Sequence, residues 1–136
     1  MDLVINKDSQ EPIYNQIYYQ ITSQILNHSL KAGEQLPTIR SIANELRISV
    51  IPVKMAWESL EKNGFILTKT GKGTFIADIT SDRRDFHKSK EAEKLAEQAC
   101  RKAKELGLTE DEFIQLIKEK YTFNPVLQGS PTEQNL

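Results

Sequence analysis

The sequence predicts a mainly α-helical protein that carries one small β-hairpin. Apolar residues recur at helical spacing in three segments before residue 64, and two short β-type runs joined by a glycine-rich loop follow them. Two more helical patterns complete the chain. With 136 residues, of which 38% are hydrophobic, it can bury one modest core and a small second element. We therefore expect one domain with an appendage.

The first helix is expected directly after Pro12, because every fourth residue from Ile13 to Ile25 is isoleucine and proline suits a first helical turn. A short strand is predicted before it, at residues 3–5. Gly33 and Pro37 interrupt the helical pattern that follows.

The second and third helices are short and close together. Thr38 is expected to cap a helix of about nine residues, and Ser49 is the natural N-cap of the next one. Asn63 and Gly64 favour the end of that third helix. Its buried stripe is predicted to contain Val53, Ala56, Trp57 and Leu60.

The β-type runs at residues 65–68 and 74–77 flank the loop "KTGKG", which predicts a hairpin. Residues 78–91 are polar and indicate a linker or a frayed helix start. A helical pattern from 92 to 106 ends at Gly107, and a capping box from Thr109 to Glu112 begins the last helix.

These patterns divide the chain into three parts. Residues 1–78 form a three-helix and hairpin domain, residues 79–123 a helical region, and residues 124–136 a tail that we expect to be disordered. Three helices followed by a glycine-tipped hairpin are the arrangement of a winged helix-turn-helix, whose third helix enters the DNA major groove. The C-terminal part is predicted to be a two-helix hairpin.

The residues from Pro12 to Ala77 resemble the DNA-binding domain of GntR-family transcriptional regulators. The resemblance is carried by "PIYNQI", "LKAGEQLPTIR", "SIANEL", "WESLEKNG" and the wing "KTGKGTFI". It implies DNA contacts from the second helix, the third helix and the wing glycine. Carried onto this sequence, these are Thr38, Arg40, Ser49, Lys54, Gly71 and Lys72.

The chemistry of these residues agrees with the resemblance. Hydroxyl and backbone N–H groups at helix N-termini favour phosphate, and Arg40 can bind phosphate or guanine with its forked guanidinium. Gly71 lets the wing backbone approach DNA, and Lys69 and Lys72 are expected to contact phosphates. The whole chain has a net charge of −1, but residues 34–77 hold six basic and four acidic side chains. The predicted surface is therefore a local patch.

The start of the third helix departs from the family pattern. Related helices usually carry arginine where Val50 stands and a polar residue where Pro52 stands. We expect Val50, Ile51 and Pro52 to contact thymine methyl groups instead, with fewer hydrogen bonds to bases.

The two C-terminal helices resemble the short dimerisation region of the YtrA-like subfamily. Their apolar stripes are too extensive to be hidden against each other, and a second copy of the chain would cover them. The residues expected at this homodimer interface are Leu95, Ala99, Ala103, Leu106, Phe113, Ile114 and Ile117.

Several classes of function have no candidate residues. No Ser/His/Asp arrangement and no metal-ligand spacing is present, so we expect no enzyme, no metal and no cofactor. Cys100 is the single cysteine and is expected to be packed, which excludes an internal disulfide and suits the cytoplasm. No leader segment or membrane span is recognised.

The sequence thus predicts a dimeric DNA-binding regulator, most simply a repressor at a pseudo-palindromic operator of double-stranded DNA. The alternative is a winged-helix scaffold for protein interactions that lacks sequence-specific DNA binding. A small-molecule effector is left open. Its candidate lining is Tyr14, Tyr18, Tyr19, Phe86, Phe113 and Tyr121.

Overall fold

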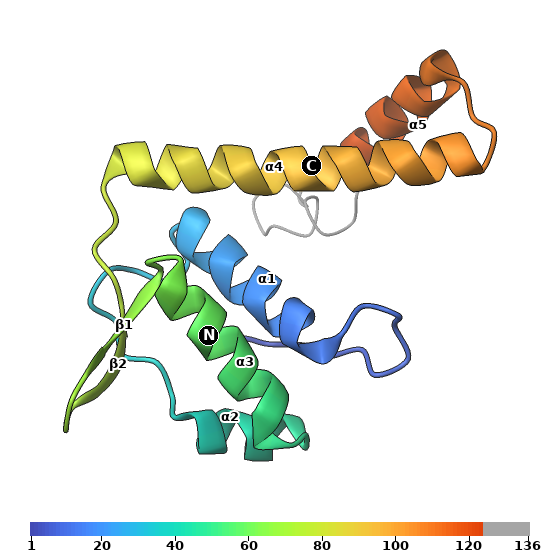
Figure 1. The fold of residues 1–136 in the computed structure, drawn as a ribbon. Coiled ribbons are helices and arrows are strands. Elements are labelled where there is room, and N and C mark those ends of the chain that lie inside the picture. The colour runs from blue at the N-terminus through green and yellow to red at the C-terminus, as the bar shows by residue number, and fades with distance from the viewer. Residues whose placement is uncertain (124–136) are drawn as a thin grey trace. The chain divides into compact units, whose positions relative to one another are not determined.

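The computed structural model describes residues 1–123, which form five helices and one antiparallel hairpin (Figure 1). The predicted fold class, a mainly helical winged helix-turn-helix followed by two C-terminal helices, is confirmed. The chain divides into two compact units, with the boundary between Lys88 and Ser89. The elements are α1 (Ile13–Leu26), α2 (Ile39–Leu46), α3 (Val50–Lys62), β1 (Ile66–Lys69), β2 (Gly73–Ile76), α4 (Ser81–Glu105) and α5 (Glu110–Thr122).

The core of the first unit lies where α1 and α3 run side by side and α2 and the hairpin close around them (Figure 1). The predicted stripe of α3 is buried, and the isoleucines of α1 from Ile17 to Ile25 face it. Phe65, which follows α3, is completely buried beside them. The buried cluster comprises Ile17, Ile21, Ile25, Leu30, Leu36, Ile42, Ala43, Val53, Ala56, Trp57, Leu60, Phe65, Ile66 and Ile76.

The ends of α2 and α3 are closed by specific backbone hydrogen bonds. The Thr38 hydroxyl accepts a hydrogen bond from the Ser41 N–H at 3.0 Å, so the predicted cap of α2 is confirmed. Behind α2, the Ile48 N–H donates to the Ala43 carbonyl at 3.0 Å, and Arg47 takes the left-handed conformation with φ +58°. Gly64 takes the same place after α3, with φ +81°.

The wing contains more than the two predicted strands. Ile66 pairs with Ile76 and Lys69 with Gly73, which leaves a three-residue tip. The segment between α1 and α2 lies along the other edge of β2, where Gln35 forms a bridge with Phe75 and the Leu36 N–H donates to the Thr74 carbonyl at 2.8 Å. This third edge fixes the hairpin to the helical core.

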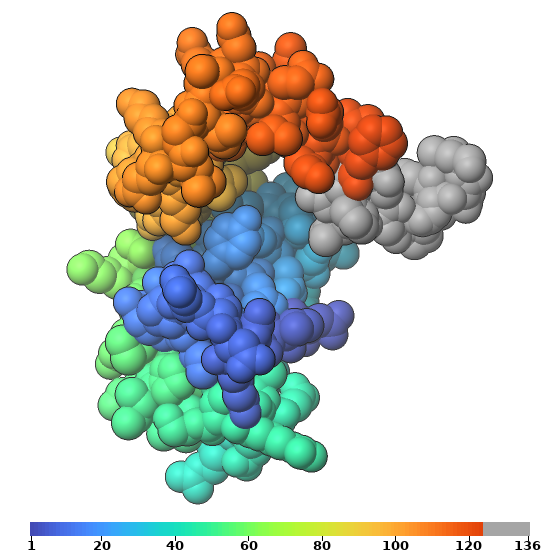
Figure 2. Space-filling model, turned by 90° about the vertical axis from the view of Figure 1, so that its right-hand side faces the viewer, coloured from blue at the N-terminus to red at the C-terminus, as the bar shows by residue number. Residues whose placement is uncertain are grey.

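The predicted strand at residues 3–5 is wrong, because the N-terminal segment pairs with side chains and not with another strand. Gln20 donates to and accepts from the backbone of Val4 at 2.7 and 2.9 Å. Gln16 pairs in the same way with Asn6, and Gln24 donates to the Asp2 carbonyl. Four residues of a helix and two residues of an extended chain both advance about 6 to 7 Å. Every fourth residue of α1 can therefore pair with every second residue of the N-terminal segment. Figure 2 shows the dark blue N-terminal residues on the surface of this unit.

Residues 78–91 are not a linker for most of their length, because α4 already begins at Ser81. The Arg84 guanidinium donates to the Ile25 carbonyl at 2.6 Å, and the His87 ring stacks on Phe65 with 4.4 Å between the centroids. These contacts give the first two turns of α4 tertiary partners in the first unit. A polar composition alone could not show this.

The second unit contains the remainder of α4 and α5. Gly107 ends α4 with φ +82°, and the Leu108 N–H donates to the Ala103 carbonyl at 3.0 Å. The predicted capping box is confirmed, since Thr109 and Glu112 exchange hydrogen bonds of 2.8 and 3.1 Å. Ala103 is the one buried residue between Ser89 and Phe123. The predicted tail at 124–136 lies outside the described residues.

Candidate nucleic-acid interface

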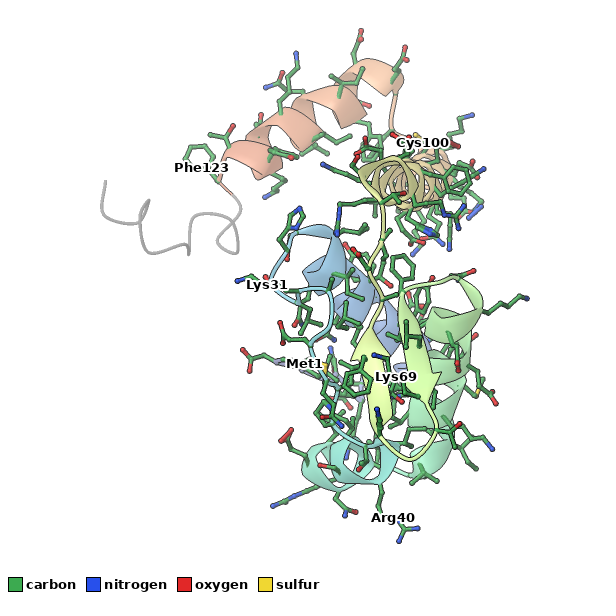
Figure 3. The ribbon with its side chains drawn as sticks, turned by 90° about the vertical axis from the view of Figure 1, so that its left-hand side faces the viewer. Met1, Lys31, Arg40, Lys69, Cys100 and Phe123 are labelled. Atoms are coloured by element: carbon green, nitrogen blue, oxygen red, sulfur yellow. The ribbon has the colours of Figure 1, made fainter. Side chains whose placement is uncertain are left out.

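The N-terminus of α2 presents one cation and one hydroxyl at the surface of the first unit. Arg40 stands in the first turn, is exposed, and points away from the domain (Figure 3). Thr38 is also exposed, but its hydroxyl already serves as the helix cap. The Arg40 side chain is therefore available to bind an anion, while Thr38 stabilises the helical turn from which Arg40 projects.

The N-terminus of α3 consists of three exposed residues, Ser49, Val50 and Ile51, followed by a proline. Ser49 is at the predicted cap position, yet its side chain makes no capping hydrogen bond. Pro52 has no N–H, and it stands in the first turn, where this amide would lack a helical partner. The hydroxyl of Ser49 and the amides of Val50 and Ile51 thus remain available to acceptors on a ligand.

The exposed face of α3 is apolar near its N-terminus and charged further along the helix. The side chains of Val50, Ile51 and Met55 are 45%, 65% and 40% exposed. Lys54 is exposed between them, and Glu58 follows one turn later. The first turn and a half of this face is therefore apolar with a single cation, and a carboxylate comes after it.

The tip of the wing consists of Thr70, Gly71 and Lys72, all exposed. Gly71 has φ +77° with open space around it, so the backbone conformation is what requires glycine there. The Lys69 ammonium lies over the Phe75 ring, 4.9 Å from its centroid, while Lys72 makes the turn by donating its N–H to the Lys69 carbonyl. Figure 3 shows Lys69 on this hairpin.

Four residues at this surface were missed by the sequence patterns. The Gln35 amide donates to the Lys72 carbonyl at 3.0 Å, and a Cβ at Gly73 would come within 2.5 Å of that amide nitrogen. Gln35 and Gly73 therefore set the position of the wing tip. Lys7 donates to the Arg47 carbonyl at 3.3 Å in the turn between α2 and α3. Only Met55 had a signal in the sequence, since it lies four residues after Ile51 and so on the same helical face.

In the second unit, α4 and α5 enclose an apolar groove of about 480 Å³. Of the residues predicted for dimerisation, Ala103, Phe113, Ile114 and Ile117 line this groove. Leu95 is exposed elsewhere on α4, Leu106 is exposed directly after the end of α4, and Ala99 is half-buried. The groove is also lined by Cys100, Lys104, Leu108, Thr109 and Glu110.

The predicted packing of Cys100 is wrong in the single chain, because this thiol is exposed at the groove. Its neighbour Ala99 suggested a core position, but α5 covers Ala103, one turn further along. The candidate effector aromatics are divided between the two units: Tyr18 packs edge-on against Phe65 in the first, and Phe113 lines the groove in the second. Between residues 1 and 123, no cluster of His, Cys, Asp and Glu has a metal-binding arrangement.

The geometry defines a winged-helix DNA-binding protein. Arg40, the face of α3 and the wing tip belong to one unit, with α3 supported from behind by the core. Within the described part of the chain, no helix has the length and apolar character needed to span a membrane.

The family model for bacterial regulatory proteins of the gntR family matches residues 13–76. The chain is 33% identical over 110 residues to the uncharacterized HTH-type transcriptional regulator YhcF of Bacillus subtilis (strain 168), covering 81% of this chain and 90% of that protein. It is 35% identical over 74 residues to the HTH-type transcriptional repressor YtrA of the same strain, covering 54% of this chain and 57% of the repressor.

Among solved structures, a transcriptional antiterminator from Listeria monocytogenes EGD-e matches with a TM-score of 0.71 and 31% identity, over 89% of this chain and 90% of that one. The chain therefore belongs to the GntR family and is YtrA-like. It is a transcriptional regulator with a DNA-binding domain. The expectation that it is not an enzyme is confirmed by these relatives, which are regulators of transcription.

Proposed function

We propose that this protein is a cytoplasmic, homodimeric repressor that binds a pseudo-palindromic DNA operator and blocks a promoter. In this proposal, each first unit reads one half-site and the second units pair the two chains. A two-fold symmetric dimer requires a two-fold symmetric target, because both recognition helices present the same surface.

The observation that carries the dimer is the uncovered apolar surface of the second unit. Ile114 and Ile117 line the α4–α5 groove and are 42% and 46% exposed, and Leu95 and Leu106 are more exposed still. Burying apolar surface contributes about 25 cal/mol for each Å² removed from water. A second copy of the chain carries the same apolar surface, so the two copies can cover each other in a symmetric pair.

The proposed DNA contacts fall into two groups. Arg40, Lys54, Lys69 and Lys72 neutralise phosphates, and the Ser49 hydroxyl and the Gly71 backbone approach the DNA without a long side chain. Thr38 holds the first turn of α2 in place. Because residues 34–77 have a surplus of only two positive charges, one unit alone should bind weakly, and two linked units far more tightly.

Repression is supported by the family relationship, since the matched relative YtrA is itself named a transcriptional repressor. The first test is selection of bound fragments from a random duplex library with the full chain. A two-fold symmetric enriched sequence, with an affinity that falls steeply as salt rises, is the expected result. If no sequence were enriched, the protein-interaction scaffold would be the better explanation.

Arg40→Ala tests the first group of contacts on the selected operator. We expect affinity to fall at least severalfold at moderate salt with unchanged thermal stability, because Arg40 is exposed. Lys31→Ala is the matched control, since Lys31 is exposed at the opposite end of the first unit (Figure 3). Equal affinities of the two variants in a mobility-shift titration would remove Arg40 from the interface.

Ile114→Glu combined with Ile117→Glu tests the pairing of the second units. We expect sedimentation to show a monomer, because two carboxylates would be buried without partners in the dimer. Val4→Glu, a change at another exposed apolar residue, should leave the dimer intact. A dimer that survives the double substitution would place the interface elsewhere.

A further inference from the structure

We infer that the start of α3 recognises thymine methyl groups, so that each operator half-site has A·T pairs where this helix enters the major groove. The inference rests on the proposed function and specifies what that same surface reads. The surface concerned is the apolar tip, defined as Val50, Ile51, Pro52 and Met55.

The apolar tip is an unusual surface for a soluble chain to expose. Single exposed apolar residues are common, but these four share one and a half turns of one helix. Three of them have exposed fractions between 40% and 65%, whereas the opposite side of the same helix is buried. The helix therefore presents this side to an apolar partner.

The surroundings of the apolar tip identify that partner as DNA. Ser49 precedes it, Lys54 lies within it, and Arg40 and the wing lysines belong to the same winged-helix unit. A protein partner would need acidic side chains placed around an apolar centre to match both the patch and these cations. A DNA major groove offers phosphates at its edges and methyl groups on its floor.

The side chains of the apolar tip also limit how bases can be read. Val50, Ile51 and Pro52 have no hydrogen-bonding side-chain group, and Pro52 has no N–H. G·C and A·T pairs both present two acceptors and one donor in the major groove, so these side chains cannot distinguish the two pairs by hydrogen bonds. An A·T pair offers the thymine methyl, which these side chains can cover.

Glu58 marks the position along α3 at which the apolar contact with the bases should end. It stands one turn after Lys54 on the same face and is exposed. A carboxylate is repelled by phosphates, although it can accept a hydrogen bond from cytosine. We therefore expect the thymine preference to cover the base pairs opposite Val50 to Met55 and to end where Glu58 approaches the groove.

Deoxyuridine provides the test, because it differs from thymine only in lacking the methyl group. Fragment selection with wild type and with Ile51→Ala first identifies the operator positions that depend on the apolar tip. Those thymines are then replaced one at a time by deoxyuridine in the selected duplex. We expect wild-type affinity to fall roughly fourfold for each methyl that the tip covers.

Two controls accompany this measurement. Ile51→Ala should show less than about a twofold loss at the same positions, because its methyl contact is already gone. Val4→Ala, at an exposed apolar residue outside α3, should respond like wild type. All these side chains are exposed, and the DNA substitution itself leaves the protein unchanged.

The outcomes separate this inference from the proposed function. If a symmetric operator were enriched but deoxyuridine bound as tightly as thymine, or if G·C pairs stood at the Ile51-dependent positions, methyl recognition would be refuted and the regulator retained. If the full chain enriched no sequence, both would be refuted. A thymine-dependent loss that Ile51→Ala removes supports both.

Discussion

The two units of this chain bury their apolar residues to very different extents. In the first, helices of only 8 to 14 residues enclose a complete core, because α1, α2, α3 and the hairpin approach it from several sides. In the second, α4 and α5 bury Ala103 alone among the described residues. The first unit therefore has a closed core within one chain, whereas the second leaves most of its large apolar residues exposed.

The difference follows from the number of elements, not from hydrophobicity alone. Leu60 of α3 and Leu95 of α4 are the same residue type on the apolar side of a helix, yet Leu60 is fully buried and Leu95 is 61% exposed. A pair of helices has too few faces to surround its own stripes. Pairing of chains, as proposed above, would supply the missing faces.

The largest expected effect is the difference in free energy of unfolding between two leucine-to-alanine substitutions, one in each unit. We expect Leu60→Ala to lower the free energy of unfolding of the first unit by about 2–5 kcal/mol, because it leaves a cavity in a closed core. Leu95→Ala should change the free energy of unfolding of the first unit by less than about 0.5 kcal/mol, because Leu95 lies in the second unit and is exposed in the single chain. Trp57, the only tryptophan and buried in the first unit, reports this unfolding by fluorescence. Equal effects of the two changes would contradict the comparison.

The next effect concerns the first two turns of α4. A chain ending at Lys88 should unfold like the first unit of the full protein, whereas one ending at Asp78 should be less stable by about 1–3 kcal/mol. The shorter chain loses the Arg84 hydrogen bond to Ile25 and the His87 stack on Phe65. Denaturant titrations of both, followed by Trp57 emission, measure the difference. Identical midpoints would show that these contacts add nothing.

A smaller effect is expected at the helix ends. Gly64 and Arg47 hold the same left-handed position after α3 and α2. Gly64→Ala should destabilise the first unit by about 1–2 kcal/mol, and Arg47→Gly should stabilise it by about 0.5–1 kcal/mol. Thermal melts should thus move in opposite directions. Two shifts of the same sign would contradict this account of the turns.

The smallest effect is expected at Thr22, a buried residue of α1. Its hydroxyl has no hydrogen-bond partner among the described residues. Thr22→Val keeps the shape and removes the unpaired polar group, so we expect the free energy of unfolding to rise by up to about 1 kcal/mol. Thr22→Ser, which keeps the hydroxyl, should not be stabilising. A stabilised serine variant would exclude this explanation.

Most of the first unit could be predicted from sequence because its signals are local. Helical spacing revealed α1 and α3, and the capping residues Thr38 and Thr109 located the starts of α2 and α5. The strand predicted at residues 3–5 and the linker alternative for residues 78–91 were wrong, because the partners of both segments are distant in the sequence. The strand-like segment pairs with glutamine side chains of α1, and the polar segment is helical with contacts to Ile25 and Phe65.

The candidate DNA surface shows the same division. The sequence alone was enough to nominate Arg40, Ser49 and Gly71 as contact residues and to identify the apolar start of α3. Only the tertiary structure decides that Lys69 lies over Phe75 and that Gln35 fixes the wing. Spacing along the chain determines which face of a helix a residue occupies, whereas packing between distant segments determines what that face meets.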